Sequence, residues 1–304
     1  MQHSDEDSGR RGVAAPLPET VTTLDDVGSL DKAARRHEVR CGDTVMVWRS
    51  WGNGGIGADR GTAPPVVMLH GGSGSWTHWV RNIAALVAAG RMVWVPDLPG
   101  FGESSRPAGG SDADALPEPV EFALQTLLGD AAVDLVGFSF GAMVAVFIAA
   151  DRPSRLRRLV LSGAPALGVQ PETPFVLRPW RHLEGEKLAA AHRINLGRLM
   201  LARPESIDAL AMAIHAFNLP RDRMKTRRLS RTDILLRTLP RIRCPVYGIW
   251  GSEDVLYRGV LDRVAPALAQ APDFRWFRSI PGAGHWVQYE SALEFDRALA
   301  EALA

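Results

Sequence analysis

Residues 133–150 read VDLVGFSFGAMVAVFIAA, and this stretch decides the fold that we expect. The apolar-rich residues 133–136 run directly into Gly137-Phe138-Ser139-Phe140-Gly141, and an apolar segment of helical length follows. This is the pattern G-x-S-x-G between a strand and a helix, the context in which a serine is presented on a sharp turn. We therefore predict that Ser139 lies at the head of a helix, where unpaired N–H groups favour a developing anion.

Two further motifs supply the partners that such a serine requires. A serine hydroxyl is a poor nucleophile until a base removes its proton, so a histidine and an orienting acid must accompany Ser139. In this architecture the acid follows the serine, and the histidine follows the acid. Asp254 ends the sequence GSED after one apolar run, and His285 stands in GHW after another. We predict Asp254 as the acid, in preference to the adjacent Glu253, and His285 as the base.

A tetrahedral oxyanion needs two backbone donors, one of them from the residue after the nucleophile. Phe140 supplies that first donor. The segment HGGSG at residues 70–74 follows an apolar run and supplies the second, which we assign to the N–H of Gly72. The same segment does not predict a nucleotide site, because it has neither a G-x-G-x-x-G spacing nor a Gly-Lys-Ser/Thr ending.

Outward from this centre, short apolar runs alternate with segments of helical length. The runs are residues 66–69, 92–95, 133–136, 159–161, 246–250 and 274–277, and the helical segments are 79–89, 118–128, 141–150, 256–269 and 291–303. Residues 37–41 and 44–51 flank Gly42-Asp43 and predict a hairpin. This alternation predicts an α/β fold, with a mostly parallel central sheet covered on both faces.

The rhythm of strands and helices breaks once, between residues 166 and 243. This stretch has no clear strand and contains two helical segments, 183–202 and 206–217. We therefore expect a core formed by residues 35–165 and 244–304, with 166–243 as a helical insertion. Residues 1–34 read as a flexible lead-in, and residues 53–65 as a loop rich in glycine and proline.

Composition excludes several classes of protein. With 304 residues, 46% apolar and 23% charged, the chain fits one large globular domain, and its net charge of +1 favours neither nucleic acid nor anionic lipid. Cys41 and Cys244 form neither a disulfide framework nor a zinc cluster, which suits a reducing compartment. Residues 1–19 are polar, and the longest apolar-rich stretch, 137–150, is short for a membrane span. We expect a soluble, cytoplasmic protein without membrane or nucleic-acid partners.

The motifs together resemble the α/β-hydrolase fold superfamily. They are HGG at 70–72, DLPGFGES at 97–104, GFSFG at 137–141, GSED at 251–254 and GHW at 284–286, and the resemblance runs from about residue 36 to the C-terminus. It implies that residues 166–243 form a cap after the sixth strand, with the nucleophile on Ser139, the acid on Asp254 and the base on His285. It also implies that His70 and Asp97 organise loops.

From these residues we predict a serine hydrolase of a small carboxylic ester, lactone or related acyl compound that needs no cofactor and no metal. Residues 284–288, GHWVQ, also resemble meta-cleavage-product hydrolases, which split carbon–carbon bonds in dienoic acids. Those enzymes usually carry Asn before the nucleophile, where this chain has Phe138, and a cap arginine that holds a carboxylate. His215, Arg221 and Arg223 are the candidates for that second role. A third alternative is a non-catalytic protein that binds a small ligand in the same pocket.

Aromatic and basic residues give weaker predictions about the pocket. The residues that we predict to line it are Trp76, Phe138, His215 and Trp286, with Trp79 and Trp180 as further candidates that fit a core equally well. We expect His78, His182 and His192 to be surface or loop residues. Residues 221–243 carry nine Arg and Lys, which predicts a solvated face or a site that attracts an acidic substrate. The oligomeric state stays open, and a homodimer is compatible with the sequence.

Overall fold

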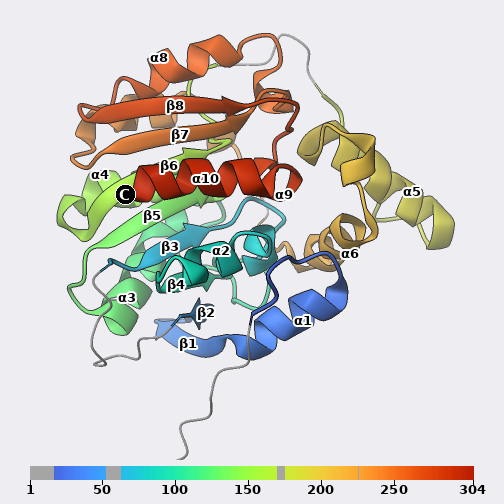
Figure 1. Cartoon of the computed structure of the whole chain (residues 1–304), viewed down its shortest axis with the longest axis horizontal. Helices are drawn as coiled ribbons and strands as arrows, with labels where there is room; N and C mark the ends of the chain where they lie inside the picture. The colour runs from blue at the N-terminus through green and yellow to red at the C-terminus, as the bar shows by residue number, and fades with distance from the viewer. Residues whose placement is uncertain (1–16, 53–62, 170–174, 225) are drawn as a thin grey trace, which may run out of the picture.

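An eight-stranded, mostly parallel sheet forms the centre of the chain (Figure 1). The structure is a computed structural model that describes residues 17–52, 63–169, 175–224 and 226–304. In sheet order the strands are β1 (Arg35–Cys41), β2 (Thr44–Trp51), β4 (Val93–Pro96), β3 (Val66–Leu69), β5 (Val133–Phe138), β6 (Leu156–Ser162), β7 (Val246–Gly251) and β8 (Phe274–Ile280). The first two form the predicted hairpin, β2 pairs antiparallel with β4, and the others are parallel. The predicted fold class is confirmed.

Helices cover both faces of the sheet, which explains why its central strands are continuous apolar runs. The helices are α1 (Leu24–Ala33), α2 (Ile83–Ala88), α3 (Pro117–Leu128), α4 (Phe140–Asp151), α5 (Gly185–Asn195), α6 (Ala209–Asn218), α7 (Ile234–Thr238), α8 (Val264–Leu268), α9 (Val287–Glu290) and α10 (Ala292–Leu303). Side chains of α3, α4 and α8 pack on one face, and those of α1, α2 and α10 on the other. All four residues of β3 are fully buried between these two layers.

The expectation of a flexible lead-in is wrong for the part that the structure describes. Residues 1–16 lie outside the described residues, but α1 begins at Leu24 with a capping box between Thr23 and Asp26. Leu30 is fully buried, and its carbonyl accepts a hydrogen bond of 2.8 Å from the indole of Trp51. Leu30 is the one buried residue of α1, and Val27 and Ala33 are partly buried, so the apolar side of this helix is a weak periodic signal in the sequence.

Two predicted helices are shorter than expected. The segment 256–269 divides into the 3₁₀ turns Val255–Tyr257 and Leu261–Arg263 and the short α8, because Gly259 between the turns has a φ of 80°. The segment 79–89 becomes the 3₁₀ turn Trp76–Trp79 followed by α2. Of the predicted loop 53–65, residues 53–62 lie outside the described residues.

Residues 166–243, hereafter the insertion, connect β6 to β7. They contain α5, which continues as a single π-helical turn (Leu196–Met200), then α6 and α7. No strand occurs in the insertion among its described residues 166–169, 175–224 and 226–243. Figure 1 shows that α5 and α6 lie beyond one end of the sheet.

Two sets of hydrogen bonds fix the insertion to the core. In the first, the N–H of Trp286 donates to the carbonyl of Met200 over 2.7 Å, and the Glu290 carboxylate accepts from the N–H groups of Ala202 and Gly284.

In the second set, the N–H of Arg223 donates to the carbonyl of Gly100 over 2.8 Å, and the Ser73 hydroxyl donates to Asp222 over 2.6 Å. Both sets join the insertion to loops that follow strands of the sheet.

Candidate active site

Ser139 occupies the turn between β5 and α4, and its backbone is strained. Its φ is 52° and its ψ is −115°, a conformation that non-glycine residues rarely adopt. The flanking glycines are required by close packing: a Cβ on Gly137 would lie 2.6 Å from the Cα of Ala142, and one on Gly141 would lie 2.5 Å from the carbonyl oxygen of His70. The turn therefore depends on the two glycines of the G-x-S-x-G pattern.

Ser139, His285 and Asp254 form one chain of hydrogen bonds, although they are far apart in the sequence. The His285 Nε2 lies 2.9 Å from the Ser139 Oγ, and its Nδ1 lies 2.9 Å from the Asp254 Oδ2. His285 is 2% exposed and Asp254 is 1% exposed, so water has little access to the bond between them. When Asp254 accepts the Nδ1–H, the Nε2 is the acceptor that faces the serine hydroxyl. The arrangement can therefore move a proton from serine to histidine.

Gly163 packs directly against the imidazole of His285. It follows β6 with a φ of 55°, and a Cβ there would lie 2.8 Å from the Cε1 of His285. Asp254 is further held by its second oxygen, which accepts the N–H of Leu256 over 3.0 Å. Both partners of the imidazole are thus fixed by the loops at the strand ends.

The two residues predicted to supply oxyanion donors line the cavity that contains Ser139. Phe140 is the first residue of α4, so its N–H has no acceptor within the helix. Gly72 lies in the loop after β3, directly against the side chain of Arg227. Among the described residues, neither N–H donates to another backbone or side-chain group. Their role as donors stays a prediction.

The cavity at Ser139 has a volume of about 1010 Å³ and is formed by the core and the insertion together. The core contributes Gly72, Ser73, His78, Phe138, Ser139, Phe140, Pro165, Leu256, Tyr257 and His285. The insertion contributes Ala166, Val169, Phe175, Val176, Leu177, Trp180, Asn195, Leu199, Met200, His215, Leu219, Thr226, Arg227, Arg228, Ser230 and Arg231. Most of the lining is therefore apolar, and its three arginines all come from residues 227–231.

Of the four predicted pocket residues, Phe138 and His215 line the cavity and the two tryptophans do not. Trp76 is 5% exposed and packs against Trp51 in the core. Trp286 is 1% exposed and stacks on Tyr289 with 4.2 Å between ring centroids. The predictions for Trp76 and Trp286 are wrong because both rings point into the layer beneath the loops that carry them.

The two further tryptophan candidates divide in the same way. Trp180 lines the cavity from the insertion, whereas Trp79 is fully buried against Phe295. Of these four candidates, the three that belong to the core pack in its interior, and Trp180, on the insertion, reaches the cavity.

His78 is a cavity residue that the sequence analysis misplaced. It is 4% exposed, and its ring lies 4.9 Å from that of Trp286 and 5.5 Å from that of Phe138. Its Nδ1 has no hydrogen-bond partner among the described residues, and burial lowers the pKa of the ring well below its usual value. The signal in the sequence is WTHW, a polar residue held between two tryptophans directly after the glycine-rich loop.

The insertion contributes a pair of buried imidazoles, His192 and His215. The rings of His192 and His215 meet edge to face at 5.2 Å, so the expectation that His192 is a surface residue is also wrong. Burial lowers the pKa of both, that of His215 to about 4. His215 therefore faces the cavity as a neutral ring. His182 is exposed, as expected.

The basic run contributes to the cavity, but through residues other than the two candidates. Arg221 lies over the ring of Phe217, 3.6 Å from its centroid, and the side chain of Arg223 donates to the carbonyl of Gly102 over 3.0 Å. Neither lines the cavity, whereas Arg227, Arg228 and Arg231 do. Lys225, in the same run, lies outside the described residues.

His70 holds the loop after β3 against the loop after β4. Its Nδ1 lies 2.8 Å from the carbonyl oxygen of Gly71, and its Nε2 accepts the N–H of Leu98 over 2.9 Å. These partners require a neutral ring, and burial lowers the pKa of His70 to about 4. His70 thus organises the two loops, as we expected from the sequence.

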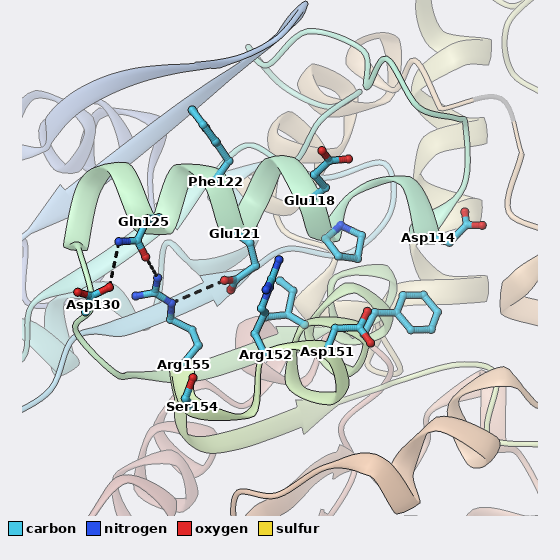
Figure 2. A pocket seen from close by; sticks show the side chains of 13 residues that line it. Asp114, Glu118, Glu121, Phe122, Gln125, Asp130, Asp151, Arg152, Ser154 and Arg155 are labelled. Atoms are coloured by element: carbon cyan, nitrogen blue, oxygen red, sulfur yellow. Dashed lines mark hydrogen bonds and ion pairs between the residues drawn. The ribbon is translucent and has the colours of Figure 1, made fainter.

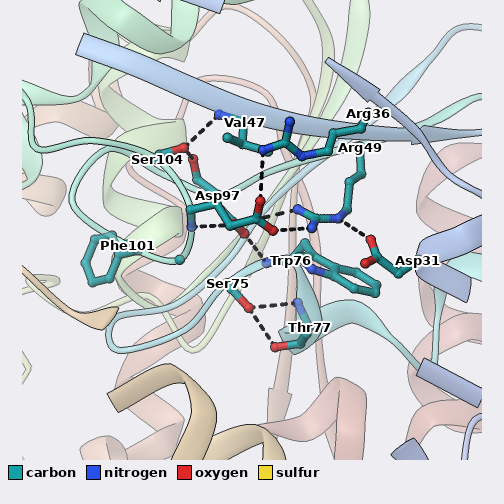
Figure 3. A network of polar contacts seen from close by, with 12 residues as sticks. Asp31, Arg36, Val47, Arg49, Ser75, Trp76, Thr77, Asp97, Phe101 and Ser104 are labelled. Atoms are coloured by element: carbon teal, nitrogen blue, oxygen red, sulfur yellow. Dashed lines mark hydrogen bonds and ion pairs between the residues drawn. The ribbon is translucent and has the colours of Figure 1, made fainter. Parts of the chain in front are cut away.

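Asp97 has a similar position in a buried polar network (Figure 3). Its carboxylate accepts the N–H groups of Trp76 and Glu103, each over 2.9 Å, and burial raises the pKa of Asp97. Arg49, 3% exposed, lies 3.7 Å from this carboxylate and also pairs with Asp31 of α1 over 2.6 Å. Through this network, α1 and β2 support the loop after β4 and the loop after β3, the second of which borders the cavity.

A second hollow lies between α3 and α4, away from Ser139 (Figure 2). Arg155 and Asp130, which line it, precede β6 and β5, so the hollow lies toward the opposite ends of these strands. Arg155 is engaged there with the carbonyl of Gly129 and with Glu121, 3.7 Å away. This hollow is a surface groove whose polar groups largely pair with one another.

Neither a metal cluster nor a membrane-spanning helix is found among the described residues. No group of three or more His, Cys, Asp or Glu side chains in the described ranges could hold a metal ion. No helix in the same ranges is long and apolar enough to cross a membrane. The only cysteines, Cys41 and Cys244, are free thiols, and Cys244 is buried.

Comparisons with known proteins agree with this fold. The profile of the alpha/beta hydrolase fold family matches residues 64–199. The 2-hydroxy-6-oxo-6-phenylhexa-2,4-dienoate hydrolase of Burkholderia cepacia is 28% identical, covering 81% of this chain and 90% of that protein. The 2-hydroxy-6-oxononadienedioate/2-hydroxy-6-oxononatrienedioate hydrolase 2 of Pseudomonas putida is 31% identical, covering 77% of this chain and 86% of that protein.

Among solved structures, the enol-lactonase of Burkholderia xenovorans LB400 superimposes with a TM-score of 0.67 at 23% identity. The match covers 88% of this chain and 99% of the lactonase. At this identity the likeness establishes a common fold.

Proposed function

The chain belongs to the α/β-hydrolase superfamily and is a hydrolase of that fold, and we propose that it cleaves a small carboxylic ester or lactone through an acyl-enzyme. The single observation that carries this proposal is the chain of hydrogen bonds from Ser139 through His285 to Asp254, with 2.9 Å at each step. That spacing is within the reach that nucleophile and base need for proton transfer.

In the first half of the reaction, the Ser139 Oγ attacks the acyl carbon while its proton passes to the Nε2 of His285. Asp254 keeps the imidazole in the required tautomer and stabilises the imidazolium that forms. The N–H groups of Gly72 and Phe140 bind the tetrahedral oxyanion. When the intermediate collapses, the bond to the leaving group breaks and His285 returns the proton to it.

In the second half, water replaces the leaving group. His285 takes a proton from the water, whose oxygen attacks the acyl carbon of the Ser139 ester. The second tetrahedral intermediate then releases the free acid, and the proton returns to the Ser139 Oγ. No step requires a group other than the side chains and N–H groups named here.

The lining of the cavity favours an acyl compound that also carries a carboxylate. Arg228 and Arg231 are exposed residues on its wall, and neither forms an ion pair with a carboxylate of the described residues. Arginines in this position attract an anion and can pair with it in two parallel hydrogen bonds. The apolar remainder of the wall fits the hydrocarbon part of such a substrate.

A carbon–carbon bond hydrolase is the second candidate, because the curated relatives act on dienoates that bear carboxylates. The same serine chemistry would then act on a ketone carbonyl, with a carbanion equivalent leaving in place of an alcohol. Phe138 stands against this alternative, since it puts an apolar ring where those hydrolases usually carry an amide.

The insertion, residues 166–243, would act as the cap of this enzyme over the core of residues 35–165 and 244–304. It contributes more than half of the residues that line the cavity, so it would set the shape of the substrate and limit access of water. A cytoplasmic location stays a prediction.

The test is the hydrolysis of a graded series of p-nitrophenyl esters, beside a lactone and a 2-hydroxy-6-oxo dienoate. We expect turnover of the esters, and Ser139→Ala should lower kcat by about 10⁶. Labelling of Ser139 by a fluorophosphonate probe, read by peptide mass spectrometry, gives a second measurement. Faster turnover of the dienoate than of every ester would favour the second candidate. Absence of labelling in the folded protein would favour a ligand-binding protein.

A further inference from the structure

The guanidinium of Arg227 lies at the two residues that we assign to the oxyanion hole. A Cβ on Gly72 would be 3.0 Å from the Cζ of Arg227, so a larger residue there would push the guanidinium away by a few tenths of an ångström. The same Cζ lies 5.8 Å from the centroid of the Phe140 ring and 5.6 Å from that of Phe101. Arg227 lines the cavity together with Ser139. A cation from the insertion therefore lies beside the two residues whose N–H groups we assign to the oxyanion hole.

One edge of this guanidinium is held by two side chains. The Nη2 of Arg227 is hydrogen-bonded and ion-paired to Asp222, and its Nη1 lies 3.4 Å from the Ser73 Oγ. Ser73 itself donates to Asp222 over 2.6 Å and has a φ of 52°, which is unusual for a serine. Ser73 follows Gly72 directly. The guanidinium is thus fixed relative to the loop that carries the Gly72 donor.

The Nε of Arg227 has no hydrogen-bond partner among the described residues, although it is buried. Leaving a buried charged donor unpaired is more costly than leaving a neutral one unpaired, so such a group calls for an explanation. An acceptor that exists only during the reaction would satisfy it.

We propose that the Nε–H of Arg227 is a third donor of the oxyanion hole, beside the N–H groups of Gly72 and Phe140. This inference rests on the proposed function. As the bond from the Ser139 Oγ to the acyl carbon forms, the carbonyl π pair moves onto oxygen, and that oxygen accepts from Arg227. The arginine keeps its proton, and its charge strengthens the hydrogen bond. When the intermediate collapses, the pair returns to the carbonyl.

The geometry separates this role from that of a carboxylate anchor. An anchor would use the forked Nη edge of the guanidinium, and in Arg227 that edge is occupied by Asp222 and Ser73. Arg228 and Arg231, which line the same cavity, pair with no carboxylate of the described residues. The substrate carboxylate is therefore assigned to these two residues, and the oxyanion to Arg227.

The test is Arg227→Met on p-nitrophenyl butyrate, a substrate without a carboxylate. We expect kcat to fall by about 10²-fold, the loss typical of one oxyanion donor, with KM nearly unchanged. Arg227→Lys keeps a cation that can pair with Asp222 but has no Nε–H, so it should also lose most of this factor. If Arg227→Met does not fold, Arg227→Lys gives the same reading. Arg237→Met, on the surface of α7, is the matched control and should behave as wild type.

Binding of 1-butaneboronic acid gives a second measurement that a merely structural role would not change. The boronate forms a tetrahedral anion on Ser139, so Arg227→Met should weaken it by about tenfold or more in calorimetry, while butyrate binding changes little. Wild-type kcat and wild-type boronate affinity in Arg227→Met would overturn the proposal for Arg227 alone. A wild-type protein that neither hydrolyses the ester nor binds the boronate would contradict the proposed function as well.

Discussion

The two walls of the cavity differ in how their polar side chains are fixed. On the wall formed by the strand ends, Ser139, His285 and Asp254 are bonded to one another in series. On the wall formed by the insertion, His215 has a buried ring nitrogen without a partner, and Arg228 pairs with no carboxylate among the described residues. These three side chains of the first wall are bonded to one another before a substrate arrives, whereas the second wall has side-chain donors that a substrate would satisfy. In the proposed function, the first wall would supply the nucleophile and its base, and the second would contribute most of the contacts to the substrate.

The sharpest test of the strand-end wall is Asp254→Asn. The amide cannot hold His285 in the tautomer whose Nε2 accepts the serine proton, so kcat should fall by about 10⁴-fold. The measurement is steady-state kinetics on p-nitrophenyl butyrate. Glu253→Gln is the matched control, because Glu253 is the neighbouring carboxylate and is exposed. A larger loss in Glu253→Gln than in Asp254→Asn would contradict the assignment of the acid.

Gly163→Ala tests whether the imidazole must stay in its observed position. The new methyl group would meet the His285 ring at 2.8–2.9 Å and displace it from Ser139. A displacement of about 1 Å can cost roughly 10²-fold in kcat, which is the loss that we expect. Gly282→Ala separates this from backbone strain, because Gly282 also has a positive φ, of 69°, but has open space around it. Equal losses in the two variants would show that strain alone is responsible.

On the insertion wall, the double variant Arg228→Met/Arg231→Met should change recognition and leave the chemistry intact. We expect KM for mono-p-nitrophenyl adipate to rise by about tenfold, because an exposed pair of arginines contributes one to two kcal/mol to binding an anion. The kcat for neutral p-nitrophenyl hexanoate should stay near the wild-type value. Raising the salt concentration should reduce the difference between the two substrates in wild type. An equal rise in KM for both substrates would contradict a charge-specific role.

The smallest expected effect concerns acid. Burial lowers the pKa of His215 in α6 to about 4 from its ordinary 6.5, so between these pH values an opened state binds a proton that the folded state does not. The contribution of neutral His215 to the stability of this wall is therefore fully present above pH 6.5 and is lost as the pH falls towards 4.

Hydrogen exchange at pH 7 and pH 5, corrected for intrinsic rates, measures the effect. Protection of α6 should fall by a factor of about 3–10, and that of α4 should change less. His215→Phe should remove the pH dependence in α6. Equal losses of protection in α4 and α6 would contradict a difference between the walls.

The sequence predicted the strand-end wall far better than the insertion wall, and the reason is physical. The turn at Ser139 needs glycines on both sides because backbone atoms approach within 2.6 Å of where a side chain would begin. Such a requirement leaves a local pattern that can be recognised. The same holds for the hairpin at Gly42, whose φ is 56°, and for the parallel strands, which are continuous apolar runs. The catalytic roles of the residues remain predictions until they are measured.

The residues of the insertion wall have no such local requirement. Arg221 and Arg223 stand four to six positions from Arg227 and have the same chemistry, yet they contact the ring of Phe217 and the carbonyl of Gly102 instead of the cavity. Which arginine faces inward depends on the path of the chain through short turns, and these leave no periodic signal. The predictions for Trp76 and Trp286 were wrong for a related reason, since an aromatic side chain next to a motif can point to either side of its loop.

The two attachments of the insertion have a consequence for protein engineering. Because Met200 and Ala202 are bonded to the loop of His285, and Asp222 and Arg223 to the loops of Gly72 and Gly100, chain grafted from another enzyme must keep these four positions. Between them, a graft must also keep Asp208, which pairs with Arg81 over 2.9 Å, and Asn218, which is hydrogen-bonded to Ser75 and Thr77. A library on the other positions of residues 203–221 would vary the part of the wall that carries His215 and Leu219, while these anchoring points stay in place.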